Sequence, residues 1–288
     1  MRGIAEFTMR GRMQALLVIG LSIFSVFFFW VGAAALALVV LRGGISEGAW
    51  LLLWALLPAL LVLQQFNEFA PLAALLGAFA AAAVLRSTVS WPPTLVVATL
   101  SGALTGGALM LFAGAYLAEV EALMADFIGQ LQGQMATEGQ VLELPVPNAM
   151  FIAGSIALVN ALTVVVSLVL GRYWQAVLYN PGGFREEFHR VRLPLALAAP
   201  LVGIALAGVA LGGGWLPWGF LATVPCLIAG ISLVHGLVGL KQWKGHWLVL
   251  FYLLLVLVNP VKEMVIVAAL VDSVMNFRQR IAVGKGQQ

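Results

Sequence analysis

The chain has 288 residues, of which 62% are hydrophobic and only 9% are charged, and its mean hydropathy is +1.03. A soluble domain carries about 25% charged residues, so this composition excludes an ordinary soluble protein and indicates membrane-crossing helices. The net charge of +3 would suggest nucleic acid for a soluble protein. Here the basic residues lie in loops between apolar runs, and no nucleic-acid partner is expected. The single cysteine, Cys226, excludes an intrachain disulfide and a cysteine metal cluster.

The first apolar run covers residues 13–41 and follows three arginines. It is too long for the hydrophobic core of a signal peptide, so we interpret it as a retained anchor. As one helix it would measure about 43 Å, against a hydrocarbon core of about 30 Å. It is therefore either one strongly tilted span, or a hairpin of short helices that breaks near residues 30–32.

Further apolar segments predict more membrane spans, and they cover residues 46–63, 69–85, 92–117, 148–170, 195–211, 216–240 and 246–275. The last one contains Asn259-Pro260, where proline removes a helix hydrogen bond and favours a break. The expected fold is all-α, with one integral membrane domain over residues 1–288. It is a polytopic helical bundle with eight strong crossings, and up to ten if the short or broken hairpin helices at both ends complete their passes. Gly102-x-x-x-Gly106 and Gly208-x-x-x-Gly212 predict close helix packing.

The orientation follows from the basic residues, because cytoplasmic loops carry an excess of Lys and Arg. If residues 13–41 and 246–275 are both hairpins, all 15 Lys and Arg except Lys262 face the cytoplasm. A single crossing by residues 13–41 would move Arg42 and Arg86 outside and would contradict this rule at nearly every loop. We therefore expect a protein of a bacterial inner membrane with both termini in the cytoplasm. The acidic residues expected on the other side are Glu68, Glu119, Glu121, Asp126, Glu138, Glu143 and Glu263.

Residues 118–147 are predicted to form a periplasmic amphipathic helix and a loop. Apolar residues recur there at spacings of three and four, as on one face of a helix: Leu117, Val120, Met124, Phe127 and Leu131. This helix is expected to continue the span over residues 92–117 and to end in a loop closed by Pro145 and Pro147. It either rests on the membrane surface, which we favour, or forms a lid over an outward-facing cavity.

The densest cluster of charge lies in the predicted cytoplasmic loop over residues 172–194. It contains four arginines together with Glu186, Glu187 and His189; the arginines are Arg172, Arg185, Arg190 and Arg192. This loop could dock a cytoplasmic protein partner or contact anionic lipid headgroups of the bilayer. Glu186 and Glu187 weaken the lipid interpretation because they partly offset the arginines.

The sequence contains none of the motifs HExxH, GxxxxGK[ST], GxSxG or CxxC, so we predict no catalytic residue, metal or cofactor. Polar residues inside or at the ends of spans are the candidates for binding a small-molecule ligand, because each is costly there unless paired. These candidate substrate-binding residues are Asn67, Glu68, Asn160, Asn259, Lys262 and Glu263. Convergence on one cavity would favour a solute site. Otherwise Asn67-Glu68 is a solvated turn, Asn160 joins two helices, and Asn259-Pro260 is a surface turn.

Three polar residues fall at positions i, i+4 and i+8 near the end of the last apolar segment: Asp272, Asn276 and Arg280. This spacing predicts a polar stripe on one face of the last helix, directed towards protein. Its expected role is structural, with Asp272 satisfied by Asn276 or by an arginine from another helix.

The segment Asp272-Ser-Val-Met-Asn276-Phe-Arg278-Gln-Arg280 resembles the ending of the YybS-like family of bacterial membrane proteins. The Asn180-Pro181 turn before Arg192-Leu-Pro194, and Leu41-Arg42-Gly43-Gly44, fit the same pattern. That family is remotely similar in organisation to substrate-binding membrane subunits of energy-coupling-factor vitamin transporters, which is an analogy of fold only. The leading interpretation is a membrane protein that binds or transports a small solute without its own ATPase. The alternative is a non-transporting scaffold that recruits a cytoplasmic partner through residues 172–194.

Overall fold

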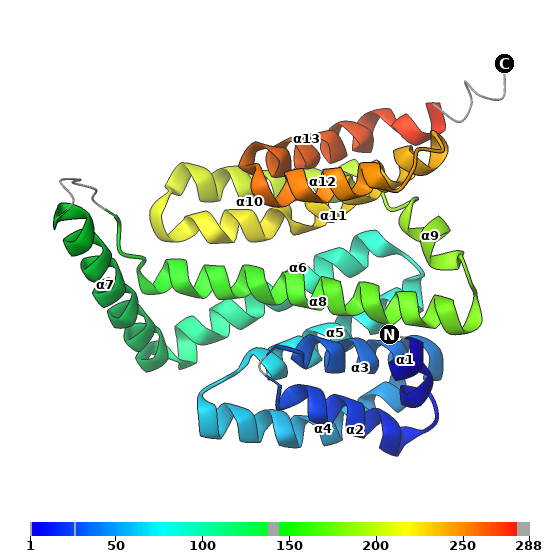
Figure 1. Cartoon of the computed structure of the whole chain (residues 1–288), viewed down its shortest axis with the longest axis horizontal. Helices are drawn as coiled ribbons and strands as arrows, with labels where there is room; N and C mark the ends of the chain where they lie inside the picture. Colours follow the sequence, from blue (N-terminus) through cyan, green and yellow to red (C-terminus); the bar gives the residue numbers. More distant parts are fainter. Residues whose placement is uncertain (1, 26, 138–143, 281–288) are drawn as a thin grey trace.

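The computed structural model describes residues 2–25, 27–137 and 144–280, and its regular secondary structure within these ranges is entirely helical (Figure 1). Glu138, Glu143 and Lys285, which entered the charge count, lie outside the described residues. In chain order the helices are α1 (Arg2–Thr8), α2 (Arg12–Ile23), α3 (Phe29–Gly43), α4 (Ile45–Phe66), α5 (Ala70–Thr88), α6 (Trp91–Phe112), α7 (Gly114–Thr137), α8 (Ala149–Tyr179), α9 (Gly183–Phe188), α10 (Leu195–Leu211), the 3-10 helix η1 (Gly213–Trp215), α11 (Leu216–Leu240), α12 (His246–Leu257) and α13 (Asn259–Met275).

Five helices are long and apolar enough to cross a membrane, namely α4, α5, α6, α8 and the combined segment η1–α11. The pair α12 and α13 would count as a sixth span, although the two helices are bent by 115° at Val258. These helices fit a membrane protein, as the composition predicts. The larger number of crossings expected from the sequence depends on the shorter apolar helices α2, α3 and α10, and it stays a prediction.

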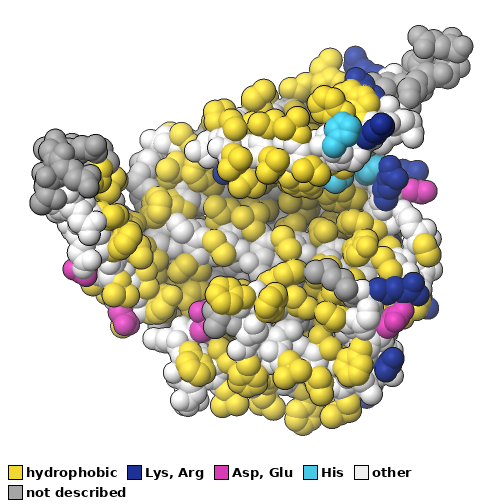
Figure 2. All heavy atoms as spheres, viewed as in Figure 1, with side chains coloured by type: hydrophobic (Ala, Val, Ile, Leu, Met, Phe, Trp, Pro, Cys, Tyr) yellow, Lys and Arg dark blue, Asp and Glu magenta, His cyan; other side chains and the backbone are white. Residues whose placement is uncertain are grey.

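The long helices run side by side along one direction, whereas α7 stands steeply across one end of the bundle and α9 lies at the other (Figure 1). We call the α9 end the basic end, because Arg42 and Arg86 lie in the last turns of α3 and α5, Lys241 directly follows α11, and Arg172 lies about two turns before the end of α8. Figure 2 shows Lys and Arg side chains gathered at this end of the visible face. The bundle is therefore electrostatically polar along its axis.

Two breaks differ from the sequence-based expectation. Residues 13–41 form two short helices, as the hairpin alternative predicts, but the break lies before residues 30–32, because α2 ends at Ile23 and α3 already begins at Phe29. The span over residues 92–117 does not continue into the amphipathic helix, because α6 ends at Phe112. The backbone of Ala113 is not helical there (φ −123°, ψ 36°), which lets α7 turn away from α6.

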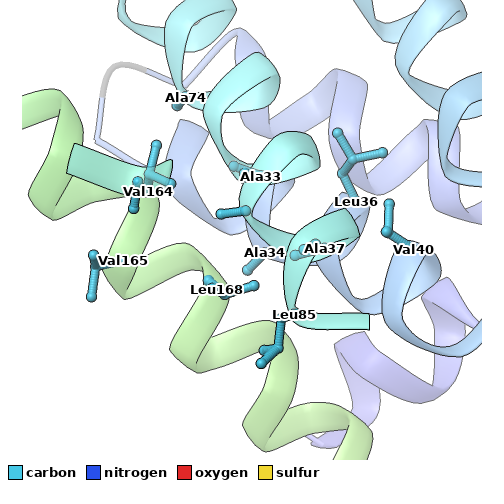
Figure 3. Packing of buried hydrophobic residues seen from close by; sticks show 14 of the residues in the cluster. Ala33, Ala34, Leu36, Ala37, Val40, Ala74, Leu85, Val164, Val165 and Leu168 are labelled. Carbon is cyan, nitrogen blue, oxygen red and sulfur yellow. The ribbon is translucent and has the colours of Figure 1, made fainter. Parts of the chain in front are cut away.

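The core is built around α3, whose residues from Gly32 to Leu41 are all buried. Three of them, Ala33, Ala34 and Ala37, lie beside Val164 and Leu168 of α8 (Figure 3). Small side chains let helix backbones approach closely, and α3 accordingly packs against both α8 and α5. The ten residues from Gly32 to Leu41, which are buried on all sides of the helix, thus hold together the first half of the bundle.

The amphipathic helix α7 packs through one end only. Leu117 is buried against α8 residues Ile152 and Ala153, and Glu121 accepts a hydrogen bond from the backbone N–H of Ala149 (3.1 Å). Further along, the apolar side chains of Leu123, Met124 and Phe127 are exposed, and that of Phe127 is 56% exposed. The described protein therefore leaves the apolar face of α7 open beyond its first turns.

Candidate functional site

A cavity of about 1000 Å³ opens at the basic end, between α9, the last turns of α11 and the residues that follow α13. Its charged lining consists of four arginines and one glutamate, with one histidine: Arg185, Arg190, Arg192, Arg278, Glu186 and His189. Figure 2 shows basic and histidine side chains together in this region. We call this space the basic cavity; the excess of arginine makes its potential positive.

The wall formed by α9 is fixed to the bundle by Glu187. Arg172 of α8 holds the Glu187 carboxylate through two hydrogen bonds, and Trp91 of α6 donates a third from Nε1 (2.7 Å). Gly182, in the left-handed region with φ 90°, turns the chain into α9. The predicted loop over residues 172–194 thus begins too early, because α8 continues to Tyr179, and the rest of it is a folded element anchored from two helices.

The opposite wall is held by a buried ion pair between Asp272 and Arg278 (3.0 Å). The other carboxylate oxygen of Asp272 accepts a hydrogen bond from the backbone N–H of Phe277 (2.8 Å). Arg278 also donates to the backbone carbonyls of His189 and Val191. Burial keeps the pKa of Arg278 below its ordinary value, while the nearby Asp272 carboxylate opposes this shift.

Arg192 completes this wall by capping the end of α13. It donates to the carbonyl oxygens of Asp272 (2.8 Å) and Ser273 (2.6 Å) in the last turn of α13, where helix carbonyls run short of backbone donors. Ser232 of α11 donates to the carbonyl of Val191 (3.0 Å). We call Asp272, Arg278, Arg192 and Ser232 the Asp272 network; it joins α11, α13 and residues 188–192.

Arg185 and Arg190 differ from the other two arginines of the cavity. Both are exposed, and neither guanidinium group has a hydrogen bond or ion pair within the part of the chain that the structure describes. Between them, His189 has a pKa below its ordinary value, first because of burial and then because of the charges of Arg185 and Arg278. The site therefore offers two free guanidinium groups in a positive, preformed cavity.

The six candidate solute-binding residues do not meet at one place. Asn67 and Glu68 form the exposed turn between α4 and α5: Asn67 is left-handed (φ 56°), and Glu68 accepts a hydrogen bond from the backbone N–H of Ala70 (3.0 Å). Asn67 also lines a second, largely apolar cavity of about 460 Å³ between α4, α5 and α6.

Asn160 is buried between α8 and α6, where its amide donates to the hydroxyl of Thr105 (3.0 Å). This bond fits the interpretation that Asn160 joins two helices. Asn259, Lys262 and Glu263 are exposed at the start of α13 and line neither cavity. A single solute site built from all six residues is therefore wrong.

The predicted stripe of Asp272, Asn276 and Arg280 is also wrong as a helix face, because α13 ends at Met275. Asn276 is the left-handed residue after the helix (φ 48°), a position that asparagine tolerates well, and its backbone N–H bonds to the Asp272 carbonyl. Asp272 is satisfied by Arg278 rather than by the Asn276 side chain, and Arg280 is exposed. The left-handed tendency of asparagine is the signal that could have placed this helix end.

Within the described residues, no group of three or more His, Cys, Asp or Glu side chains could hold a metal ion. Comparisons of this chain with protein-family models, with curated proteins and with solved structures found no match. The resemblance to the YybS-like family stays a prediction, and the functional argument depends on the geometry of the site.

Proposed function

We propose that this chain is an integral protein of a bacterial inner membrane that binds a small anionic solute in the basic cavity, without an ATPase of its own. Its helices make eight crossings, the lower number expected from the sequence, and both termini and the basic cavity face the cytoplasm. The exposed apolar side of α7 rests on the opposite membrane surface. The observation that carries the proposal is the pair of free arginines, Arg185 and Arg190, in a cavity of about 1000 Å³.

The chemistry of the cavity favours a phosphate- or carboxylate-bearing molecule. Guanidinium groups bind both anions through paired, charge-assisted hydrogen bonds. Arg192 and Arg278 are held by the Asp272 network, so they add positive potential while Arg185 and Arg190 remain free to contact a ligand. Ligand pockets usually measure about 300–1000 Å³, which places this cavity at the upper end of that range.

Replacing both free arginines should strongly weaken anion binding without unfolding the protein. We expect inorganic phosphate or citrate to raise the melting temperature of the wild-type protein, because a ligand stabilises the state that binds it. Each charge-assisted hydrogen bond lost costs about 1.5–3 kcal/mol, so the double substitution Arg185→Ala with Arg190→Ala should weaken binding at least about tenfold. Calorimetric titration of purified protein measures this change.

The matched control is Lys244→Ala, which removes an exposed positive charge from the loop between α11 and α12, outside the cavity lining. It should bind both anions like the wild type. Equal weakening by Lys244→Ala would show a general charge effect and would contradict a site at Arg185 and Arg190, as would a wild-type protein that binds neither anion.

The proposed orientation follows from the distribution of basic residues along the bundle. Reporter fusions at Arg86 and Glu187 should read as cytoplasmic, and a fusion after Thr137, the last residue of α7, should read as periplasmic. Paired phosphatase and fluorescent-protein reporters provide the measurement. A periplasmic signal at Glu187 would invert the map and would place the basic cavity outside the cell.

A second candidate function is recruitment of a cytoplasmic protein. It is favoured by the exposure of Arg185 and Glu186 on α9, which Arg172 and Glu187 anchor to the bundle, and of Arg190 just after this helix. Such a surface is already ordered before a partner binds, which lowers the entropy cost of association. This function would be favoured by a wild-type protein that binds neither anion but binds one cytoplasmic protein specifically. The double substitution Arg185→Ala with Arg190→Ala should then abolish the binding of that protein.

A further inference from the structure

The bend between α12 and α13 lies at the depth of the membrane interior. With 12 residues, α12 is about 18 Å long, which is well short of a hydrocarbon core of about 30 Å. Figure 1 shows the bend falling short of the end where α10 and α11 meet. The α12–α13 hairpin is therefore re-entrant alongside α11, which is itself long and apolar enough to span a membrane.

Contacts between α11 and α13 give the depth of the charged residues near this bend. A Cβ atom added to Gly230 would lie 2.4 Å from the Val265 carbonyl oxygen, so the two backbones touch there. Gly236 likewise approaches Arg278, which shows that the two segments run in the same direction. Lys262 and Glu263 thus lie level with about Leu227 of α11. That residue is about 16 Å from Leu216, where the helix begins, and therefore near the middle of the span.

Both charges are left without a partner at that depth. Lys262 and Glu263 are exposed, and within the described residues neither side chain makes an ion pair or a hydrogen bond. As neighbours in a helix they do not face each other. The surrounding surface is apolar: α12 has no buried residue, and Leu257 and Met264 are 76% and 68% exposed. Charges and non-helical backbone facing lipid are costly, so this surface requires a cover.

We propose that the cover is a second copy of this chain, which packs its own α12–α13 hairpin against this one. A two-fold axis beside the bend would place Lys262 of each copy next to Glu263 of the other, so that one contact neutralises four charges. The adjacent opposite charges make the surface self-complementary, as an isologous interface requires. Lipid headgroups lie at the membrane surface and not at the depth of these two charges. The apolar faces of α12 would then exclude lipid and water from both ion pairs.

The test is charge exchange at the interface, with the stoichiometry measured by light scattering in detergent and by single-molecule photobleaching in lipid bilayers. The wild-type protein should be a dimer. Lys262→Glu should weaken the dimer at least tenfold, because acidic side chains then face acidic side chains across the axis. Lys262→Glu combined with Glu263→Lys should restore the dimer, because opposite charges again face each other. A wild-type monomer in bilayers, or a double variant as weak as the single one, would overturn the proposal.

Cysteine cross-linking keeps the proposal testable even if the charge variants do not fold. In a Cys226→Ser background, Met264→Cys should give a covalent dimer with a short bifunctional reagent. The matched control is Leu53→Cys in the same background, because Leu53 is similarly exposed (63%) but lies on α4, in the other layer of the bundle (Figure 1). Equal cross-linking at both positions, or none at Met264→Cys, would contradict a dimer through α12–α13.

Discussion

Asp272→Ala should lower the free energy of unfolding by about 3–5 kcal/mol, which is the usual cost of removing one partner of a buried ion pair. The side chain of Asp272 is only 2% exposed, and that of its partner Arg278 is 12% exposed. The substitution leaves the Arg278 charge buried with only neutral acceptors, namely the backbone carbonyls of His189 and Val191 and the Ser232 hydroxyl. It also removes the acceptor for the N–H of Phe277. Thermal unfolding of the purified protein in detergent measures the loss.

Asp272→Asn separates the effect of the charge from that of the hydrogen bonds, and Glu6→Ala is the control at an exposed ion pair. Asp272→Asn retains an acceptor for Phe277 and should therefore cost less than Asp272→Ala. Glu6→Ala breaks the ion pair between Arg2 and Glu6, whose side chains are 72% and 46% exposed, and it should change stability by less than about 1 kcal/mol. If Asp272→Ala melted like the wild type but lost anion binding, Asp272 would belong to the ligand site, and its structural role would be wrong.

Gly102→Ala should destabilise the protein by about 1–3 kcal/mol, because overpacking a close helix contact forces the backbones apart. Gly102 of α6 faces α8, and a Cβ atom there would lie 2.3 Å from the Ala157 carbonyl oxygen and 2.9 Å from the Ala161 side chain. Backbone atoms of α8 cannot move aside as a flexible side chain can. The neighbouring hydrogen bond from Asn160 to Thr105 joins the same two helices and should lengthen as they separate.

The control for this prediction lies on the same helix. A Cβ atom at Gly107 would have no neighbour within 4 Å, so Gly107→Ala should be neutral or stabilise the protein by up to about 1 kcal/mol through helix propensity. The two substitutions are chemically identical and differ only in what they face. Equal melting temperatures for Gly102→Ala and Gly107→Ala would show that the contact between α6 and α8 is looser than the structure indicates.

The sequence alone was enough to predict the helical class and most helix positions, because these follow from apolar composition and local spacing. It also predicted correctly that Asp272 needs a partner, since an unpaired carboxylate is costly at the end of a membrane helix. The Gly102–Gly106 spacing predicted a close helix contact, and both glycines face the α8 backbone. Each of these predictions depends only on residues within a few turns of one another.

The tertiary structure decided which residues meet, because contacts between distant segments leave no trace in local periodicity. Arg192 lies 80 residues before Asp272 in the chain, yet it caps the same helix end. Gly212 shares a spacing with Gly208 but ends α10 at φ +64° with open space around it. Asn67, Asn160 and Lys262 look alike as polar residues in apolar runs. They occupy a turn, a helix contact and an unpaired surface, because helix packing, and not local sequence, sets the direction and depth of each side chain.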